Sequence, residues 1–319
     1  MIHNENQLTC EYRFSAMGGE FQLLCFPQSF LSREDVLKIF HKAEKEVLRI
    51  QSKFTDFEES PFNEINKYAG IRPVKVDDEI WNIIKIANRI SRESNGVFDI
   101  SFATIGHLWR EAKENGRTLS LLERTQMKAF IDYRNIQMNY FSKCIFLPFK
   151  QMRIGLGGIG KGYAIDMIYE LLLKEGISNF YINGSGDIRV HSLPSAPRAW
   201  RIGIKNPFSA DSSKSIGVLQ VSTGSIASSG GYIHFNPYSE GMSDHHIVNP
   251  RSGFSNDEII ACTVIAEHTV EADTTATILM NLDVIEAIRY LDNKKLIGFV
   301  IDRNGKTHLS VRALSSFGL

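Results

Sequence analysis

The stretch "RIGLGGIGKGYAID", residues 153–166, constrains this chain most, because it fits three kinds of nucleotide or phosphate site. Gly155, Gly157 and Gly160 match the G-x-G-x-x-G fingerprint of a dinucleotide fold, and the stretch from Gly155 to Lys161 matches the G-x-x-x-x-G-K of a phosphate-binding loop. The third interpretation is a flavin site. A purely structural interpretation stands beside them, in which the glycines only relieve steric conflict between a strand and a helix.

Two of these interpretations fit poorly. A phosphate-binding loop needs Ser or Thr after its lysine as a magnesium ligand, and this chain has Gly162 there. A dinucleotide fold normally carries its fingerprint in the first strand-turn-helix unit, followed by an acidic residue. Here the match lies in the middle of the chain, although Asp187 does follow the next predicted strand. The flavin interpretation gains from "NGSGDIR", a second glycine turn one helix downstream, and from Lys161, a partner for phosphate at a helix start.

Composition limits the kinds of partner and the cellular location that the chain is expected to have. The chain has 36 Lys plus Arg and 36 Asp plus Glu, so it offers no basic block for nucleic acid. Its four cysteines are widely spaced without a C-x-x-C pair, which predicts reduced, partly buried thiols. The first residues lack the features of an export signal, and no apolar run reaches the roughly 18 to 20 residues of a membrane span. The sequence therefore predicts a cytoplasmic protein without a membrane anchor.

Hydrophobic periodicity predicts an α+β fold. Strand-like segments outnumber helical ones and do not alternate with them regularly. The predicted helices cover residues 32–53, 80–90, 164–174, 270–281 and 284–291, and a short helical turn falls in the loop after the first of them. The predicted strands cover residues 20–26, 144–147, 152–156, 180–183, 201–204, 217–221, 226–229, 261–266 and 297–302. We expect one domain over residues 1–319, or two closely packed α+β lobes.

The segment "HTVEADTTATILMNL" is a candidate for a helix with a metal-binding face. Asp273 and Thr277 are four residues apart, so a helix would place a carboxylate and a hydroxyl on one face, as Mg²⁺ prefers. The alternative is that Thr277 bonds its own backbone carbonyl. In "SDHHIVNP", His245 and His246 would point to opposite faces of an extended chain, so one of them could serve as a general base, or both could lie in a surface turn.

Taken in order, these segments resemble the FAD:protein FMN transferases, the ApbE family. Met17-Gly18 resembles the family's M-G-T. The other matches are "SNGVFDIS" to G-x-F-D-x-T, "GLGGIGKGYAID" to D-L-G-G-I-A-K-G-Y-A-x-D, "NGSGDIR" to N-x-G-G-D-I-R, "IASSG" to A-T-S-G, "HHIVNPRSG" to H-I-I-D-P-x-T-G, and "EADTTAT" to A-D-A-x-A-T. The resemblance implies an ApbE-like, T-fold-related architecture with mixed and antiparallel sheets and packed helices.

The resemblance also implies roles for individual residues. The residues implied to bind FAD, which is a substrate, are Met17, Phe98, Asp99, Gly157, Gly158, Lys161 and Ile226. Asp273 and Thr277 would hold Mg²⁺ together with a backbone oxygen near Gly158, and His246 would be the catalytic base beside the catalytic Asp273. The implied reaction attaches FMN through a phosphoester to a Thr or Ser of a target flavoprotein and releases AMP, with no covalent enzyme intermediate.

Three positions depart from the family pattern. Gly19 replaces Thr, Gly155 replaces Asp, and Asn249 replaces Asp. The change at Gly155 removes a carboxylate that could fix ligand or metal, so the sequence alone leaves two alternatives to the transferase. One is a non-catalytic FAD-binding protein. The other is an FAD pyrophosphatase, in which water replaces the protein acceptor and the products are FMN and AMP.

Overall fold

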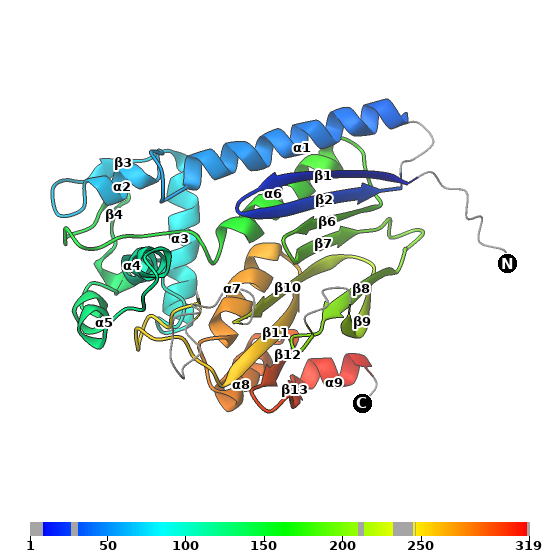
Figure 1. Cartoon of the computed structure of the whole chain (residues 1–319). Helices are drawn as coiled ribbons and strands as arrows, with labels where there is room; N and C mark the ends of the chain where they lie inside the picture. The colour runs from blue at the N-terminus through cyan, green and yellow to red at the C-terminus, as the bar shows by residue number, and fades with distance from the viewer. Residues whose placement is uncertain (1–8, 27–30, 210–213, 232–244, 246, 318–319) are drawn as a thin grey trace. The chain divides into compact units, whose positions relative to one another are not determined.

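The computed structural model describes residues 9–26, 31–209, 214–231, 245 and 247–317. The chain forms two compact units, each built from separated stretches of sequence. Unit 1 comprises residues 1–51, 160–228 and 263–273, and unit 2 comprises residues 52–159, 229–262 and 274–319. Figure 1 shows the order of their elements along the chain.

Unit 1 is built on an antiparallel sheet. Its strands are β1 (Cys10–Ala16), β2 (Gly19–Cys25), β6 (Phe180–Gly184), β7 (Asp187–His191) and β10 (Gly224–Gly230), hydrogen-bonded in that order. Each of these neighbouring pairs is antiparallel. A two-stranded ribbon, β8 (Trp200–Lys205) and β9 (Ser215–Val221), belongs to the same unit. Antiparallel pairing of neighbouring strands confirms the predicted α+β class.

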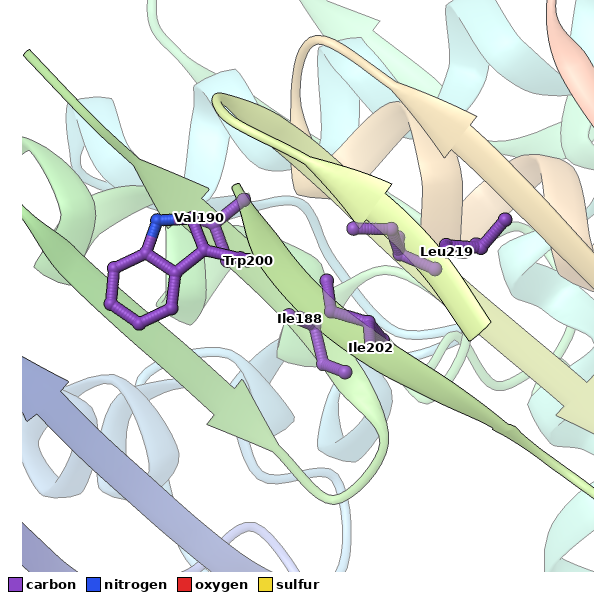
Figure 2. Packing of buried hydrophobic residues seen from close by; sticks show 6 residues of the cluster. Ile188, Val190, Trp200, Ile202 and Leu219 are labelled. Atoms are coloured by element: carbon purple, nitrogen blue, oxygen red, sulfur yellow. The ribbon is translucent and has the colours of Figure 1, made fainter. Parts of the chain in front are cut away.

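The ribbon β8–β9 packs its apolar face on the sheet of unit 1. Figure 2 shows Ile188 and Val190 of β7 facing Trp200, Ile202 and Leu219 of the ribbon. The side chain of Ile226, in β10, completes this buried cluster.

Helices α1 (Arg33–Phe54) and α6 (Gly160–Lys174) contribute to unit 1. The Ser32 hydroxyl accepts from the backbone N–H of Asp35 (3.1 Å), which fixes the start of α1. The apolar residues that recur at helical spacing in this helix are all buried: Val36, Ile39, Phe40, Ala43, Val47 and Ile50. Tyr12 of β1 donates to Glu44 of α1 (2.6 Å), so the helix lies along the β1–β2 hairpin (Figure 1).

Helix α6 ends as the sequence predicts. Gly176 adopts a φ of +86°, a left-handed conformation that favours glycine, and Ile177 N donates to Leu172 O (3.0 Å) across the helix end.

Unit 2 contains most of the other helices. They are α2 (Asn63–Lys67), α3 (Asp78–Glu93), the 3₁₀ turn η1 (Ile100–Phe102), α4 (Ala103–Glu114), α5 (Leu121–Lys128), the 3₁₀ turn η2 (Tyr133–Asn135), α8 (Val284–Lys294) and α9 (Val311–Phe317). A small antiparallel sheet has the order β3 (Val74–Lys75), β5 (Cys144–Phe146), β4 (Gln137–Asn139). Strands β12 (Ile297–Asp302) and β13 (Thr307–Leu309) pair antiparallel.

Four elements have residues in both units: helix α1, strand β10, strand β11 (Ile259–Ala266), whose neighbours are β10 and β12, and helix α7 (Thr269–Leu279). Helix α7 thus begins in unit 1 and ends in unit 2.

One predicted strand is wrong. Residues 152–156 form an irregular segment in unit 2, because side chains bind their backbone groups. The Asn66 side chain accepts from Ile154 N (2.8 Å) and donates to Ile154 O (2.9 Å). The Thr104 hydroxyl accepts from Arg153 N (3.0 Å). Backbone groups satisfied in this way need no neighbouring strand.

The four cysteines are free, and three of them are buried, as predicted. Within the described residues, no helix has both the length and the apolar character needed to span a bilayer.

Candidate functional site

Two hairpin turns of unit 1 carry predicted site residues. Met17 and Gly18 connect β1 to β2 with positive φ angles of 52° and 80°, and Ser185 and Gly186 connect β6 to β7 with φ angles of 56° and 103°. Positive φ at both central residues is typical of the two-residue turn that matches strand twist. Ser185 N donates to Glu20 O (2.9 Å), so the pairing of β2 with β6 places the two turns next to each other.

The side chain of Lys161 is held by a carboxylate. Its Nζ lies 2.5 Å from Oδ2 of Asp187, whose side chain is 3% exposed. Lys161 stands in the first turn of α6, and Asp187 begins β7 directly after the Ser185-Gly186 turn. Burial acts to lower the pKa of Lys161, but the negative charges of Asp187 and Asp273 outweigh it and raise that pKa. The lysine is therefore a fixed positive charge beside the glycine turn.

Asp273 of α7 faces the start of α6. Its Oδ2 accepts from the backbone N–H of Gly162 (3.1 Å), and its side chain is buried. Burial, reinforced by the negative charge of Asp187, raises the pKa of Asp273 to about 7. A carboxylate in such surroundings favours an additional cation, since a nearby positive charge would stabilise its ionised form.

Gly162 permits this close approach. A Cβ built on it would lie 2.8 Å from the carbonyl oxygen of Thr269, at the start of α7. Glycine at position 162, which argues against a phosphate-binding loop, is thus required by the close backbone contact between the starts of α6 and α7.

Sequence reasoning missed the role of Asp166. Its carboxylate accepts from the backbone N–H groups of Thr269 (2.8 Å) and Val270 (3.1 Å), and it forms an ion pair with Arg189. The guanidinium of Arg189 also lies 3.5 Å from the ring centroid of Tyr169. Asp166 therefore holds the first turn of α7 against α6. In the sequence, only the motifs "GYAID" and "GDIR", which contain Asp166 and Arg189, pointed to this ion pair.

In unit 2 the glycine turn packs against Phe98 and Thr277. A Cβ built on Gly158 would lie 3.2 Å from Cε2 of Phe98 and 3.4 Å from Oγ1 of Thr277. A Cβ on Gly157 would meet only Cζ of Phe102, at 3.7 Å. The structure therefore brings together Gly158, Phe98 and Thr277, three predicted site residues that lie far apart in the sequence.

Asp99 has a structural function within unit 2. Its Oδ1 accepts from the backbone N–H and the hydroxyl of Ser101 (2.8 and 2.6 Å), and its Oδ2 accepts from Tyr133 N (2.7 Å). Burial raises the pKa of Asp99, although these hydrogen bonds act in the opposite direction. Asp99 thus holds the loop that carries Phe98.

Two other predicted site residues lie in unit 1. Met17 N donates to the side-chain carbonyl of Gln51 in α1, which fixes the first hairpin turn. Ile226 is buried in the apolar cluster of Figure 2.

The predicted base, His246, lies outside the described residues. Its neighbour His245 is buried, and its Nδ1 accepts from Ile247 N (3.2 Å). His245 Nε2 therefore carries the proton and donates to Asn256 O (3.0 Å). His245 is a structural histidine of unit 2.

Asn249, one of the departures from the family pattern, also has a local reason. Its amide nitrogen donates to Asn281 O (2.9 Å), and its Oδ1 accepts from Arg251 N (2.9 Å). An aspartate at this position could not donate the first of these hydrogen bonds.

The residues proposed for metal binding offer hard oxygen donors only. Asp273 and Thr277 lie four residues apart on α7, and the family resemblance adds a backbone oxygen near Gly158. Such a set suits Mg²⁺, which takes few protein ligands and keeps water or phosphate oxygens in its remaining positions. Among the described residues, no three His, Cys, Asp or Glu side chains gather as metal ligands.

Known proteins with related sequences are flavin transferases by name. An FAD:protein FMN transferase of Klebsiella pneumoniae is 30% identical over 227 residues, covering 71% of this chain and 69% of the relative. One from Vibrio cholerae is 26% identical over 227 residues, covering 70% of this chain and 66% of the relative.

Solved structures show the same fold. The ApbE protein of Thermotoga maritima superimposes with a TM-score of 0.88 at 24% identity, covering 97% of this chain and 99% of that one. The flavin transferase ApbE of Vibrio cholerae superimposes with a TM-score of 0.82 at 19% identity, covering 96% and 98%. The model of the ApbE family matches residues 17–301. With a match over nearly its whole length, and with the lysine, carboxylate and glycine turn in place, the chain belongs to the ApbE family.

Proposed function

We propose that this chain is a magnesium-dependent FAD:protein FMN transferase. It binds FAD, transfers the FMN moiety to a Thr or Ser hydroxyl of a target flavoprotein, and releases AMP. The observation that carries the proposal is the arrangement at the start of α6 in unit 1, where Lys161 is fixed by Asp187 and Asp273 accepts from Gly162 N. This arrangement combines a fixed cation and a buried carboxylate at a helix start, which together suit a pyrophosphate and its counterion.

The chemistry of the step is a phosphoryl transfer. The acceptor oxygen attacks the phosphorus on the FMN side of FAD, the new P–O bond forms, and the bond between that phosphorus and the AMP oxygen breaks. The hydroxyl proton leaves to a base, for which His246 is our candidate, and AMP carries away the bonding electron pair. Bound Mg²⁺ would supply charge neutralisation at the pyrophosphate.

The residues of the chain contribute positioning and charge. Asp187 holds the Lys161 ammonium in one place, which removes the entropic cost of ordering a long side chain around phosphate. Asp273 and Thr277 would hold the metal from one face of α7, and Asp166 fixes the first turn of that helix. In unit 2, Phe98 provides an apolar surface against Gly158, suited to a flavin.

The test is transfer to a cytoplasmic flavoprotein fragment that bears an acceptor Thr, with FAD and Mg²⁺, read as flavin fluorescence that survives on a denaturing gel. We expect a fluorescent acceptor band that is lost in Asp273→Ala and kept in the control Asp257→Ala, because the Asp257 side chain is 61% exposed. A dark band with AMP released in the absence of acceptor would identify a pyrophosphatase. A dark band with intact bound FAD would identify a non-catalytic binding protein. The cytoplasmic location itself stays a prediction.

A further inference from the structure

Gly155 leaves its side-chain space to Asp56. A Cβ built on Gly155 would lie 2.5 Å from Oδ2 of Asp56 and 2.9 Å from Cβ of Ala103, too close for any side chain to be added without movement. It is also about the distance that separates Cβ from Oδ within a single aspartate. Both residues belong to unit 2, with Asp56 in the loop after α1.

The Asp56 carboxylate is held in place. Its Oδ2 lies 2.8 Å from Nε2 of His107 in α4, and its side chain is 12% exposed. The ring of Phe57 stacks on His107 with centroids 4.6 Å apart, and the guanidinium of Arg110 lies 3.9 Å from the Phe57 centroid. A loop anchored this firmly presents its carboxylate at one defined position beside Gly155.

In unit 1, a hydroxyl of a neighbouring residue likewise occupies the side-chain space of a glycine. A Cβ built on Gly19 would lie 1.9 Å from Oγ of Ser185, in the neighbouring hairpin turn. Within a single Thr or Ser, Cβ and Oγ are bonded, so the Ser185 hydroxyl stands close to where a hydroxyl carried by residue 19 would be. Gly19 and Gly155 are two of the positions at which the chain departs from the pattern quoted above, and in each case the missing group has a chemical equivalent beside it.

We propose that the chain has relocated these two groups rather than lost them. Asp56, positioned by His107, provides the carboxylate at residue 155, and Ser185 provides the hydroxyl at residue 19. Gly19 is then required by Ser185, and Gly155 by Asp56 together with Ala103. The ligand concerned is FAD with its metal, so the expected effect on FAD binding rests on the proposed function. The coupling of each glycine to its neighbouring side chain rests on geometry alone.

The carboxylate is tested with Asp56→Ala, Asp56→Asn, Gly155→Asp and the double variant D56A/G155D. Binding of FAD in the presence of Mg²⁺ is followed by flavin fluorescence, and the unfolding midpoint is measured without ligand. We expect Asp56→Ala and Asp56→Asn to weaken FAD binding about tenfold or more, as for loss of one hydrogen bond to a charged group. Gly155→Asp should lower the unfolding midpoint, since it forces a second carboxylate into filled space. The double variant should restore FAD affinity and recover part of the midpoint, because Cβ of residue 155 would still meet Cβ of Ala103.

Two results would overturn the carboxylate assignment. One is unchanged FAD affinity in both Asp56 variants, which would make Asp56 an anchor of its loop only. The other is a double variant no more stable than Gly155→Asp. Replacement of His107 by Gln separates positioning from folding. We expect His107→Gln to weaken FAD binding in the parent and to weaken it less in D56A/G155D, where the short side chain of residue 155 itself holds the carboxylate.

The hydroxyl is tested with Gly19→Thr, Ser185→Gly and the double variant G19T/S185G. Gly19→Thr should destabilise the protein because its Cβ would overlap Ser185, and the double variant should regain the parent's stability and FAD affinity. If the single and double variants are equally destabilised, the exchange is refuted. If the parent protein fails to bind FAD, the proposed function fails, but the unfolding midpoints of these variants still decide whether each glycine is coupled to its partner.

Discussion

Asp166→Ala tests how the first turn of α7 is held. The substitution removes the acceptor of two backbone N–H groups, at Thr269 and Val270, and leaves Arg189 without its carboxylate. The Arg189 side chain is only 5% exposed, so its charge would remain buried without a carboxylate to balance it. All of these residues belong to unit 1.

The magnitude follows from the two contributions. Breaking a buried ion pair by removing one partner costs about 3–5 kcal/mol, and removing a helix-capping acceptor costs about 1 kcal/mol. One carboxylate serves both functions, and the Tyr169 ring still covers the guanidinium, so we expect the free energy of unfolding to fall by about 4 kcal/mol. Arg189→Met should cost less, because Asp166 would keep its two N–H donors.

The assay is urea unfolding followed by circular dichroism for Asp166→Ala, Arg189→Met and the double variant. Non-additivity in the cycle measures the coupling between the two charges. A loss below about 1 kcal/mol in Asp166→Ala would refute the reasoning, since that is the cost of an exposed cap alone. So would an Arg189→Met variant that is less stable than Asp166→Ala.

Three further outcomes are expected. Gly162→Ala should lose about 1–3 kcal/mol in urea unfolding, because its Cβ would meet backbone at 2.8 Å, whereas Gly157→Ala, with its nearest atom at 3.7 Å, should stay near the parent value. Burial, helped by the positive charge of Arg189, lowers the pKa of His191 below 6.5 in the folded protein, so the unfolded chain takes up this proton at a higher pH than the folded protein does. Stability should therefore fall as the pH drops below 6.5. His191→Gln should flatten that fall, and an unchanged slope would contradict this assignment. Thr277→Val should raise the Mg²⁺ concentration needed for half-maximal transfer about tenfold, since a ligand is lost, and an unchanged Mg²⁺ dependence would remove Thr277 from the metal site.

Local signals in the sequence predicted many of the regular elements, but not β1, β7, β13, α4, α5 or α9. The caps and apolar periodicity of residues 32–53 gave α1 to within a residue at each end, and the predicted strand at 297–302 is β12. These signals lie within one element, where spacing and capping decide the structure. The short strands β3 and β4 carry too few residues for such a pattern, and residues 152–156 have a strand-like composition without a neighbouring strand.

The candidate site was predictable as a set of residues but not as a set of contacts. The resemblance pointed to Lys161 and Asp273, and the structure shows what holds each of them. That Asp56 lies against Gly155 could not be predicted, because the contact joins two loops with no shared pattern. Contacts of this kind depend on the whole packing of a unit, which no local window of sequence contains.

The division of each unit over separated stretches has a consequence for biosynthesis. Strand β2 is made early, yet Phe21 pairs with Gly184, and Lys161 meets its second carboxylate only when Asp273 has been made. Unit 1 therefore cannot complete its folding until most of the chain has been synthesised. Until β6 has been made, the edge of the β1–β2 hairpin that pairs with β6 stays unpaired. For the same reason neither unit can be excised as one continuous fragment, and a nascent chain stopped before α7 would lack the helix that completes both.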